Sequence, residues 1–243
     1  MSSTGIIRLS HLIAMRRALD KLANNVANIG TPGFKGQRSS FKEHLKEATQ
    51  SGPEPNANKY VSLVDTGFAT TDFTPGPIES TGNPLDVAIK GDGWFVVQTP
   101  GGNRYTRDGS FRLNSSGQLV TAGGHPVVTS SGALTFSPND RNIAIASDGA
   151  ISTAQGIRGR LMVVTFPNPT DLSPAGNNLF DVPKSQPLPA DAHLSVGAIE
   201  KSNVVGATEM VNLIKLTRTY EMVANMMKKD DDSVEMQRLS DTL

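Results

Sequence analysis

The side chains that most often carry out chemistry are scattered through this 243-residue sequence without a recognisable arrangement. There is no cysteine, and the histidines lack the close spacing of metal ligands: His11, His44, His125 and His193. The sequence contains no Gly-x-Ser-x-Gly elbow and no phosphate-binding glycine loop that ends in Lys-Ser or Lys-Thr. We therefore expect no enzyme activity, no metal site and no cofactor.

Three further features could suggest chemistry but have simpler interpretations. The string KKDDD at 228–232 places adjacent carboxylates that would point in different directions around a helix, so we expect it to be solvated. The string GDG at 91–93 is followed by no helix and predicts a hairpin turn, and Trp94 predicts core packing rather than a sugar platform. A pair of glycosidase-type carboxylates stays open, with nothing in the sequence to favour it.

The composition restricts the classes of partner. Lys and Arg number 23 and so do Asp and Glu, which gives no electrostatic support for binding nucleic acid. No apolar run approaches the ~20 residues of a membrane span, so we expect no membrane insertion. The N-terminus lacks the apolar core of a cleaved signal peptide; its arginines would suit a transit peptide, but a transit peptide needs no matching helix near the other end.

Both ends of the sequence carry apolar residues at the spacing of one helix face. The N-terminal stripe consists of Leu12, Met15, Leu19, Leu22, Val26 and Ile29. The C-terminal stripe includes Leu213, Leu216, Tyr220, Val223 and Met227. Each stripe predicts a helix that buries this face against another helix, either within the chain or in a neighbouring copy.

The helix boundaries follow from capping residues. The first helix should begin after the serines and threonine at 2–4 and stop at Gly30, which can take the left-handed C′ conformation, because Pro32 forbids continuation. A short helix is predicted near 40–48, and the C-terminal helix from about Asn203. The charged run at 228–232 interrupts the second stripe and leaves the helix beyond Met227 open.

The middle of the sequence has the period of β-strands. Strands are predicted at 85–89, 94–97, 110–113, 119–121, 126–128, 134–136, 143–146 and 161–166. Asp-Gly pairs at 92–93, 108–109 and 148–149 favour tight hairpins between them. The fold class is therefore α+β, in which long N- and C-terminal helices pair as a coiled-coil-like domain around a central antiparallel all-β domain. The predicted parts are an N-terminal helix at 1–33, a partly extended connection at 34–80, the β domain at 81–195 and a C-terminal helix at 196–243.

Four ordered groups of motifs resemble the bacterial flagellar rod and hook proteins. The first is LANNVAN at 22–28 with TPGFK at 31–35, and the second is TGNPLDVAI at 81–89 with GDGWF at 91–95. The third is YTRDGSF at 105–111 with GQLVT at 117–121. The fourth, in the C-terminal helix, consists of EKSNV at 200–204, EMV at 209–211 and RTYE at 218–221. The compact length is most similar to the proximal-rod branch of this family, with the distal-rod branch as the alternative.

The resemblance implies a structural subunit of the periplasmic rod in the basal body, exported by the flagellar apparatus without a cleaved signal. It further implies helical assembly with copies of itself and other rod proteins, transmission of motor torque and a channel for export. A stand-alone β-rich binding module, whose terminal helices pair only within the chain, is the less favoured interpretation.

The asparagines of the first helix predict a second contact surface on that helix. On spacing alone they would be solvated, but the LANNVAN string suggests that their amides bind a neighbour. To the two apolar stripes the expected assembly interface therefore adds Asn24, Asn25, Asn28, Phe34 and Asn203.

Overall fold

The computed structural model describes residues 3–47, 60–137, 140, 142–182, 186–191 and 193–240, with the backbone alone at 3–8, 40–69 and 230–240. The chain divides into two compact units. The helical unit comprises Met1–Ala27, Gln37–Asp72 and Val205–Leu243. The β unit comprises Asn28–Gly36 and Phe73–Val204. Helices and antiparallel strands together confirm the α+β class.

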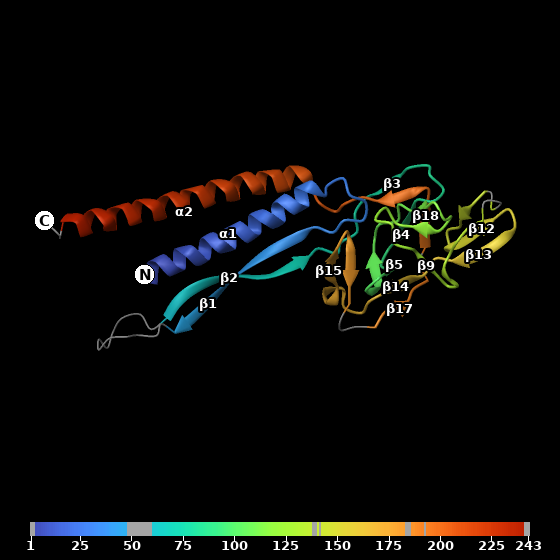
Figure 1. Cartoon of the computed structure of the whole chain (residues 1–243), viewed down its shortest axis with the longest axis horizontal. Helices are drawn as coiled ribbons and strands as arrows, with labels where there is room; N and C mark the ends of the chain where they lie inside the picture. The colour runs from blue at the N-terminus through green and yellow to red at the C-terminus, as the bar shows by residue number, and fades with distance from the viewer. Residues whose placement is uncertain are drawn as a thin grey trace. The chain divides into compact units, whose positions relative to one another are not determined.

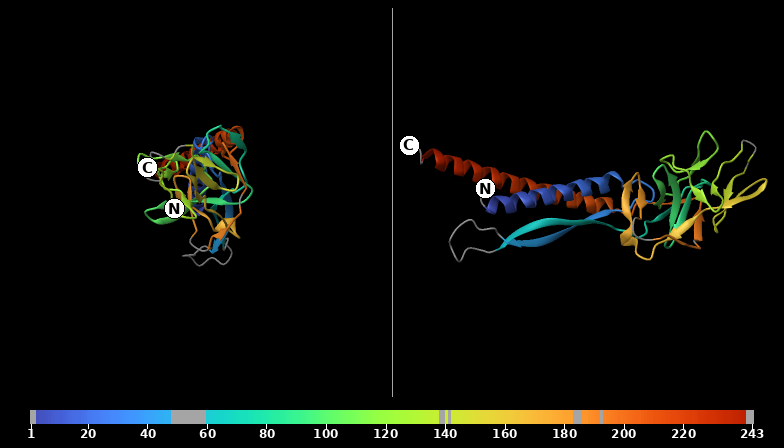
Figure 2. Two further views of the ribbon diagram at one scale, coloured as in Figure 1. Left: turned by 90° about the vertical axis from the view of Figure 1, so that its right-hand side faces the viewer. Right: turned by 60° about the horizontal axis from the view of Figure 1, so that its bottom comes forward.

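The helical unit contains two helices and a β-ribbon. The helices α1 (Ser3–Ala27) and α2 (Gly206–Ser240) lie side by side and run in opposite directions (Figures 1 and 2). The strands β1 (Gln37–Glu47) and β2 (Tyr60–Thr71) pair in an antiparallel ribbon, and both contact α1. The helices therefore do meet within one chain, while the supercoiling of a coiled coil stays a prediction.

The end of α1 differs in detail from the expectation. The helix stops at Ala27, and Gly30 does not take the left-handed conformation; the nearest glycine with positive φ is Gly33, at 66°. A turn held by Asn28 replaces the expected cap. The backbone N–H of Thr31 donates to the Asn28 carbonyl at 3.2 Å, and the Thr31 hydroxyl donates to the Asn28 side chain at 3.0 Å.

The second helix continues past the charged run at 228–232. α2 begins at Gly206, three residues after the expected start, and continues through 228–232 to Ser240.

The short helix predicted near 40–48 is wrong, because residues 37–47 form β1; residue 48 lies outside the described part of the chain. Phe41 pairs with Thr66 of β2 and Leu45 pairs with Ser62, and the register shifts between Ser39 and Phe41, where β2 has one extra residue. The long ribbon gives backbone groups along both strands a partner. This distant pairing outweighs the local preference of a polar segment, which sequence periodicity cannot reveal.

The largest sheet of the β unit is antiparallel and has the strand order β15-β16-β6-β5-β14-β17. Its strands are β5 (Trp94–Thr99), β6 (Gly102–Thr106), β14 (Val163–Thr165), β15 (Ser173–Gly176), β16 (Leu179–Asp181) and β17 (Leu188–Pro189). The short 3₁₀ helix η1 (Pro169–Asp171) precedes β15.

Smaller sheets complete this unit. They pair β3 (Ile78–Ser80) with β19 (Ala198–Glu200), β4 (Val87–Lys90) with β18 (His193–Val196), β7 (Arg112–Leu113) with β8 (Leu119–Val120), and β9 (Val128–Thr129) with β10 (Gly132–Ala133). A further sheet joins β11 (Ala144–Ile145), β12 (Ala150–Thr153) and β13 (Gly156–Arg160). The predicted strand at 134–136 forms only an isolated bridge, between Thr135 and Gln118.

Only one of the predicted Asp-Gly hairpins is a hairpin. The turn at 148–149 joins the paired strands β11 and β12. The turn at 91–93 instead passes the chain between sheets, since β4 pairs with β18 while β5 pairs with β6 and β14. The turn at 108–109 likewise leads from β6 to β7, which have different partners. An Asp-Gly pair permits a sharp turn but does not choose the strand that follows it.

Alternate residues of β5 line two separate cores, as the pleat of a strand dictates. Phe95 and Val97 are fully buried, and Phe95 packs with Phe111 in one cluster. Trp94 is 5% exposed and packs edge-to-face against Phe180 in the other, which confirms its predicted core position. Each such side chain contributes about 1.5–3 kcal/mol by leaving water.

Candidate assembly surface

The predicted stripe of α1 lies at the margin of its buried face. The most buried positions of this helix are Ala14, Ala18 and Asn25, which are 2%, 4% and 2% exposed. All six predicted stripe residues are half-buried: Leu12, Met15, Leu19, Leu22, Val26 and Ile29. Small side chains therefore mark where the neighbouring elements approach α1 most closely, and the large apolar ones keep part of their surface exposed.

The second helix carries large apolar side chains on two opposite faces, the second of which it shares with exposed Lys215, Arg218 and Glu221. Its predicted stripe is half-buried throughout: Leu213, Leu216, Tyr220, Val223 and Met227. The opposite face carries large side chains that are between 49% and 58% exposed: Met210, Val211, Ile214, Met222 and Met226. A helix that is apolar on both sides is normally covered on both sides. In the described structure only one side of α2 has such cover, from α1.

The asparagine motif has a structural role that differs from one position to the next. Asn25 accepts a hydrogen bond from the Gln37 N–H at 2.9 Å and donates to the Gln37 carbonyl at 2.9 Å. It thereby ties the end of α1 to the start of β1, and its amide also lies 3.5 Å from the Glu209 carboxylate of α2. Asn24 is exposed and Asn28 is half-buried. The side-chain amide of Asn25 therefore does bind neighbouring groups, as the motif suggested, but these groups lie in the same chain.

In the β unit, the segment after α1 lies beside the segment that precedes α2. The Gly33 N–H donates to the Glu200 carbonyl at 2.6 Å, and the Asn203 N–H donates to the Phe34 carbonyl at 3.3 Å. The Asn203 side chain accepts from the Gly36 N–H at 2.8 Å and donates to the Thr74 carbonyl at 3.0 Å. Phe34 and Asn203 are half-buried, and both therefore help to hold these segments together.

A buried ion cluster holds the same region. Lys35 Nζ lies 2.6 Å from one Glu200 oxygen, and Arg107 Nη1 lies 3.3 Å from the other. The side chains are 0%, 2% and 3% exposed for Lys35, Glu200 and Arg107. The first Glu200 oxygen also accepts the Gly76 N–H at 2.9 Å. One carboxylate therefore contacts two cations away from water.

Further contacts position the two cations. Lys35 Nζ donates to the Thr74 carbonyl at 2.8 Å, and Arg107 Nη2 donates to the Gly91 carbonyl at 2.8 Å. The Arg107 guanidinium lies 5.4 Å from the centre of the Trp94 ring. Burial lowers the pKa of Arg107, whereas the charge of Glu200 raises it, and an arginine stays protonated in either case.

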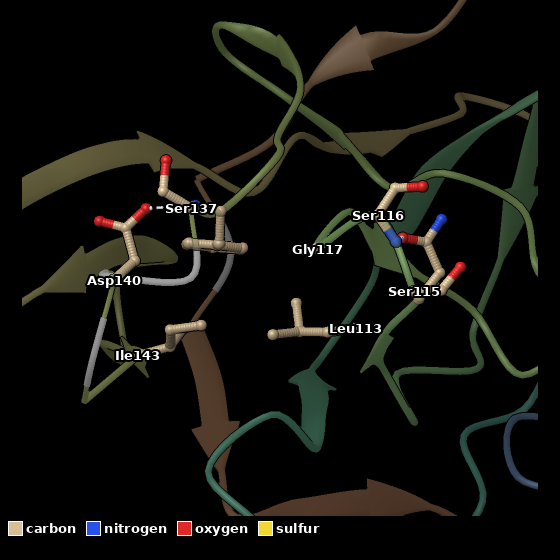
Figure 3. Close-up of a pocket in the computed structure, with 9 residues that line it drawn as sticks. Leu113, Ser115, Ser116, Gly117, Ser137, Asp140 and Ile143 are labelled. Carbon is tan, nitrogen blue, oxygen red and sulfur yellow. Dashed lines mark hydrogen bonds between the residues drawn. The ribbon is translucent and has the colours of Figure 1, made fainter.

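A hollow in the β unit is the remaining place to look for chemistry among the described residues. Figure 3 shows a hollow of about 390 Å³ in the β unit, lined by Leu113, Ile143 and Asp140 among others. The Asp140 carboxylate accepts the Ser137 N–H at 2.7 Å and lies 3.5 Å from Arg158, and among the described lining residues it has no second carboxylate beside it. Within the described ranges no three His, Asp or Glu residues gather as metal ligands, and no helix is long and apolar enough to cross a membrane.

Comparison with known proteins agrees with these features along the whole chain. Family profiles match in order at residues 9–35 (flagella basal body rod protein), 88–153 (flagellar hook protein FlgE/F/G D1 domain) and 195–236 (flagellar basal body rod FlgEFG protein C-terminal). The flagellar basal-body rod protein FlgF of Caulobacter vibrioides is 38% identical, over 98% of this chain and 96% of its own. The chain belongs to the flagellar basal-body rod protein family.

Other relatives carry two different names within this family. FlgF of Mesorhizobium japonicum is 32% identical over 96% of this chain and 95% of its own length. FlgG of Buchnera aphidicola subsp. Schizaphis graminum is 33% identical over 94% of this chain and 95% of its own. This rod protein is accordingly a structural component of the basal body of the flagellum.

The family motifs explain the ion cluster that sequence reasoning missed. Lys35, Arg107 and Glu200 each lie in a different string that carries the resemblance, and each falls in a different profile match. A single charged residue in such a string is normally expected to be solvated. The spacing of these residues in the sequence cannot show that three of them contact one another in the folded chain. Their presence in motifs more than 60 residues apart was the available signal.

Proposed function

We propose that this rod protein is an axial subunit of the proximal rod that assembles helically with copies of itself and with other rod components. The observation that carries the proposal is the second apolar face of α2, which α1 does not cover. Exposed apolar surface of this kind is typical of a protein–protein interface. This role needs no catalytic residue.

Helical growth follows if different faces of neighbouring subunits meet. A contact between unlike surfaces that does not close into a ring continues as an open filament. The long helices would supply stiffness along such a filament, and the buried ions around Glu200 would stiffen the segments that lead into them. Transmission of motor torque and enclosure of an export channel are the mechanical roles proposed for the assembled rod.

The proposed interface keeps the half-buried apolar side chains of both helices. The partial exposure of Leu19 and Val223 leaves surface that a neighbour can cover. The asparagines at 24 and 28 are proposed to extend it, while Asn25, Phe34 and Asn203 act by holding the chain in the conformation that assembles.

We further propose that the flagellar export apparatus delivers the subunit without a cleaved signal to the periplasmic rod. The distal rod is the second candidate position, because relatives named FlgG are about as similar as several named FlgF.

Labelling of the subunit in purified basal bodies tests the proposal. Label along the part of the rod nearest the inner membrane is expected. Label confined to the outer part of the rod would favour the distal position. Basal bodies without the subunit would refute a role in the rod. In a separate size measurement of the purified protein at high concentration, a persistent monomer with fully ordered helices would favour a binding module.

A further inference from the structure

A groove of about 620 Å³ crosses the helical unit between α1, the start of β1 and the first half of α2. Ala18, Leu22 and Leu216 provide its apolar lining. On α2 its lining residues extend from Thr208 to Thr219, which corresponds to about 16 Å of helix. The groove is therefore as long as three turns of a second helix.

Three cations, Lys21, Arg38 and Lys215, line this groove together with one carboxylate, that of Glu209. Arg38 is paired with Asp72 at 2.6 Å, but within the described residues Lys21 and Lys215 have no carboxylate partner. Burial lowers the pKa of Lys21, and the charge of Arg17 lowers it further. A carboxylate delivered from another molecule would neutralise the Lys21 ammonium.

The last part of α2 has the complementary properties. α1 has 25 residues and α2 has 35, so their lengths are about 37 and 52 Å and antiparallel pairing leaves about 15 Å of α2 beyond the start of α1 (Figure 1). Residues 230–240 carry four carboxylates and one guanidinium, with Met236 and Leu239 at the spacing of one helix face. This segment is helical, acidic and amphipathic.

We infer that the groove binds residues 230–240 of α2 from a second copy of this chain. The inference rests on the proposed function and names the contact by which one subunit recognises the next. The lengths agree, an apolar stripe meets an apolar lining, and carboxylates meet Lys21 and Lys215. The groove and the segment are different surfaces, so the contact is heterologous and repeats along a filament.

The segment cannot reach the groove of its own chain. Thr219 and Ser233 belong to the same continuous helix and are about 21 Å apart along it. A link between these positions therefore has to join two molecules. The absence of cysteine from the sequence makes single introduced cysteines unambiguous probes.

Disulfide trapping of the full chain tests the inference. The Thr219→Cys and Ser233→Cys proteins are mixed at a concentration that permits assembly and are then oxidised mildly. Mixed dimers are expected at least about tenfold above those of a matched pair, Asn225→Cys with Ser233→Cys, because Asn225 is exposed outside the groove. Equal yields from the two pairs, or Thr219→Cys homodimers in place of mixed dimers, would overturn the inference.

Charge exchange provides an independent readout. Lys21→Glu with Lys215→Glu should raise the concentration needed for assembly at least about tenfold, and so should Asp231→Lys with Asp232→Lys. A chain that carries all four changes should recover, whereas the exposed control Lys90→Glu should behave as the wild type. If the chain with all four changes does not regain assembly, the proposed pairing of these lysines with the aspartates is contradicted. If all variants enter rods normally, the groove contact is wrong while the rod function stands; a wild-type chain missing from rods would refute the rod function itself.

Discussion

Replacement of Glu200 by glutamine should destabilise the β unit more than any other single change of charge that we consider. Glu200→Gln keeps the shape of the side chain but removes a charge that contacts both Lys35 and Arg107. Loss of one partner from a buried ion pair costs about 3–5 kcal/mol, because the remaining charge stays away from water. A domain has only about 5–15 kcal/mol of stability, so a third or more would be lost.

The neighbouring strand offers a matched control. Glu79 lies on β3, which pairs with β19, and its carboxylate is 2.8 Å from Lys201. Both side chains of this pair are largely exposed, at 59% and 44%, so Glu79→Gln should cost less than about 1 kcal/mol. The two substitutions thus compare the same chemical change in buried and exposed surroundings.

Urea unfolding measures the difference. Trp94 is the only tryptophan and lies 5.4 Å from the Arg107 guanidinium, so its fluorescence reports on the β unit next to the cluster. The midpoint should fall strongly for Glu200→Gln with an unchanged slope, since the slope follows the surface exposed on unfolding. A Glu200→Gln protein as stable as Glu79→Gln would refute the buried-charge reasoning.

Three further predictions follow from local geometry. Gly33→Ala should lower stability by about 2 kcal/mol or more, because φ is 66° and a Cβ would lie 2.4 Å from backbone, whereas Gly30→Ala, with open space, should change the urea midpoint little. Asn25→Ala removes the side chain that bonds the Gln37 amide and carbonyl at the start of β1, so that amide should exchange with solvent at least about tenfold faster; unchanged exchange would contradict its role. Leu19→Asp and Val223→Asp should each block incorporation into rods with unchanged Trp fluorescence, and normal incorporation of both would contradict the helix interface.

The sequence predicts the elements whose signal is local. A continuous apolar run identified the buried strand at 94–97, where Phe95 enters one core and Trp94 the other. It could not assign partners to strands, so the turn at 91–93 was expected to close a hairpin although it connects two sheets. Strand pairing depends on residues far apart in sequence, to which periodicity does not respond.

The sequence located the helices of the candidate surface but not the residues that these helices bury most deeply. The apolar stripes located both helices, but Ala14 and Ala18 are more buried than any stripe residue of α1. Small residues let backbones approach closely and leave no hydrophobic stripe to detect. The burial of Lys35 does not follow from its spacing, since only the folded chain brings Glu200 to it.

Imaging of intact basal bodies at a resolution that places helices tests the central claim most directly. The account predicts that the subunit occupies the rod, with α1 and α2 packed against helices of neighbouring subunits and the exposed face of α2 covered. A rod without this subunit, or one in which its helices contact no neighbour, would contradict the account.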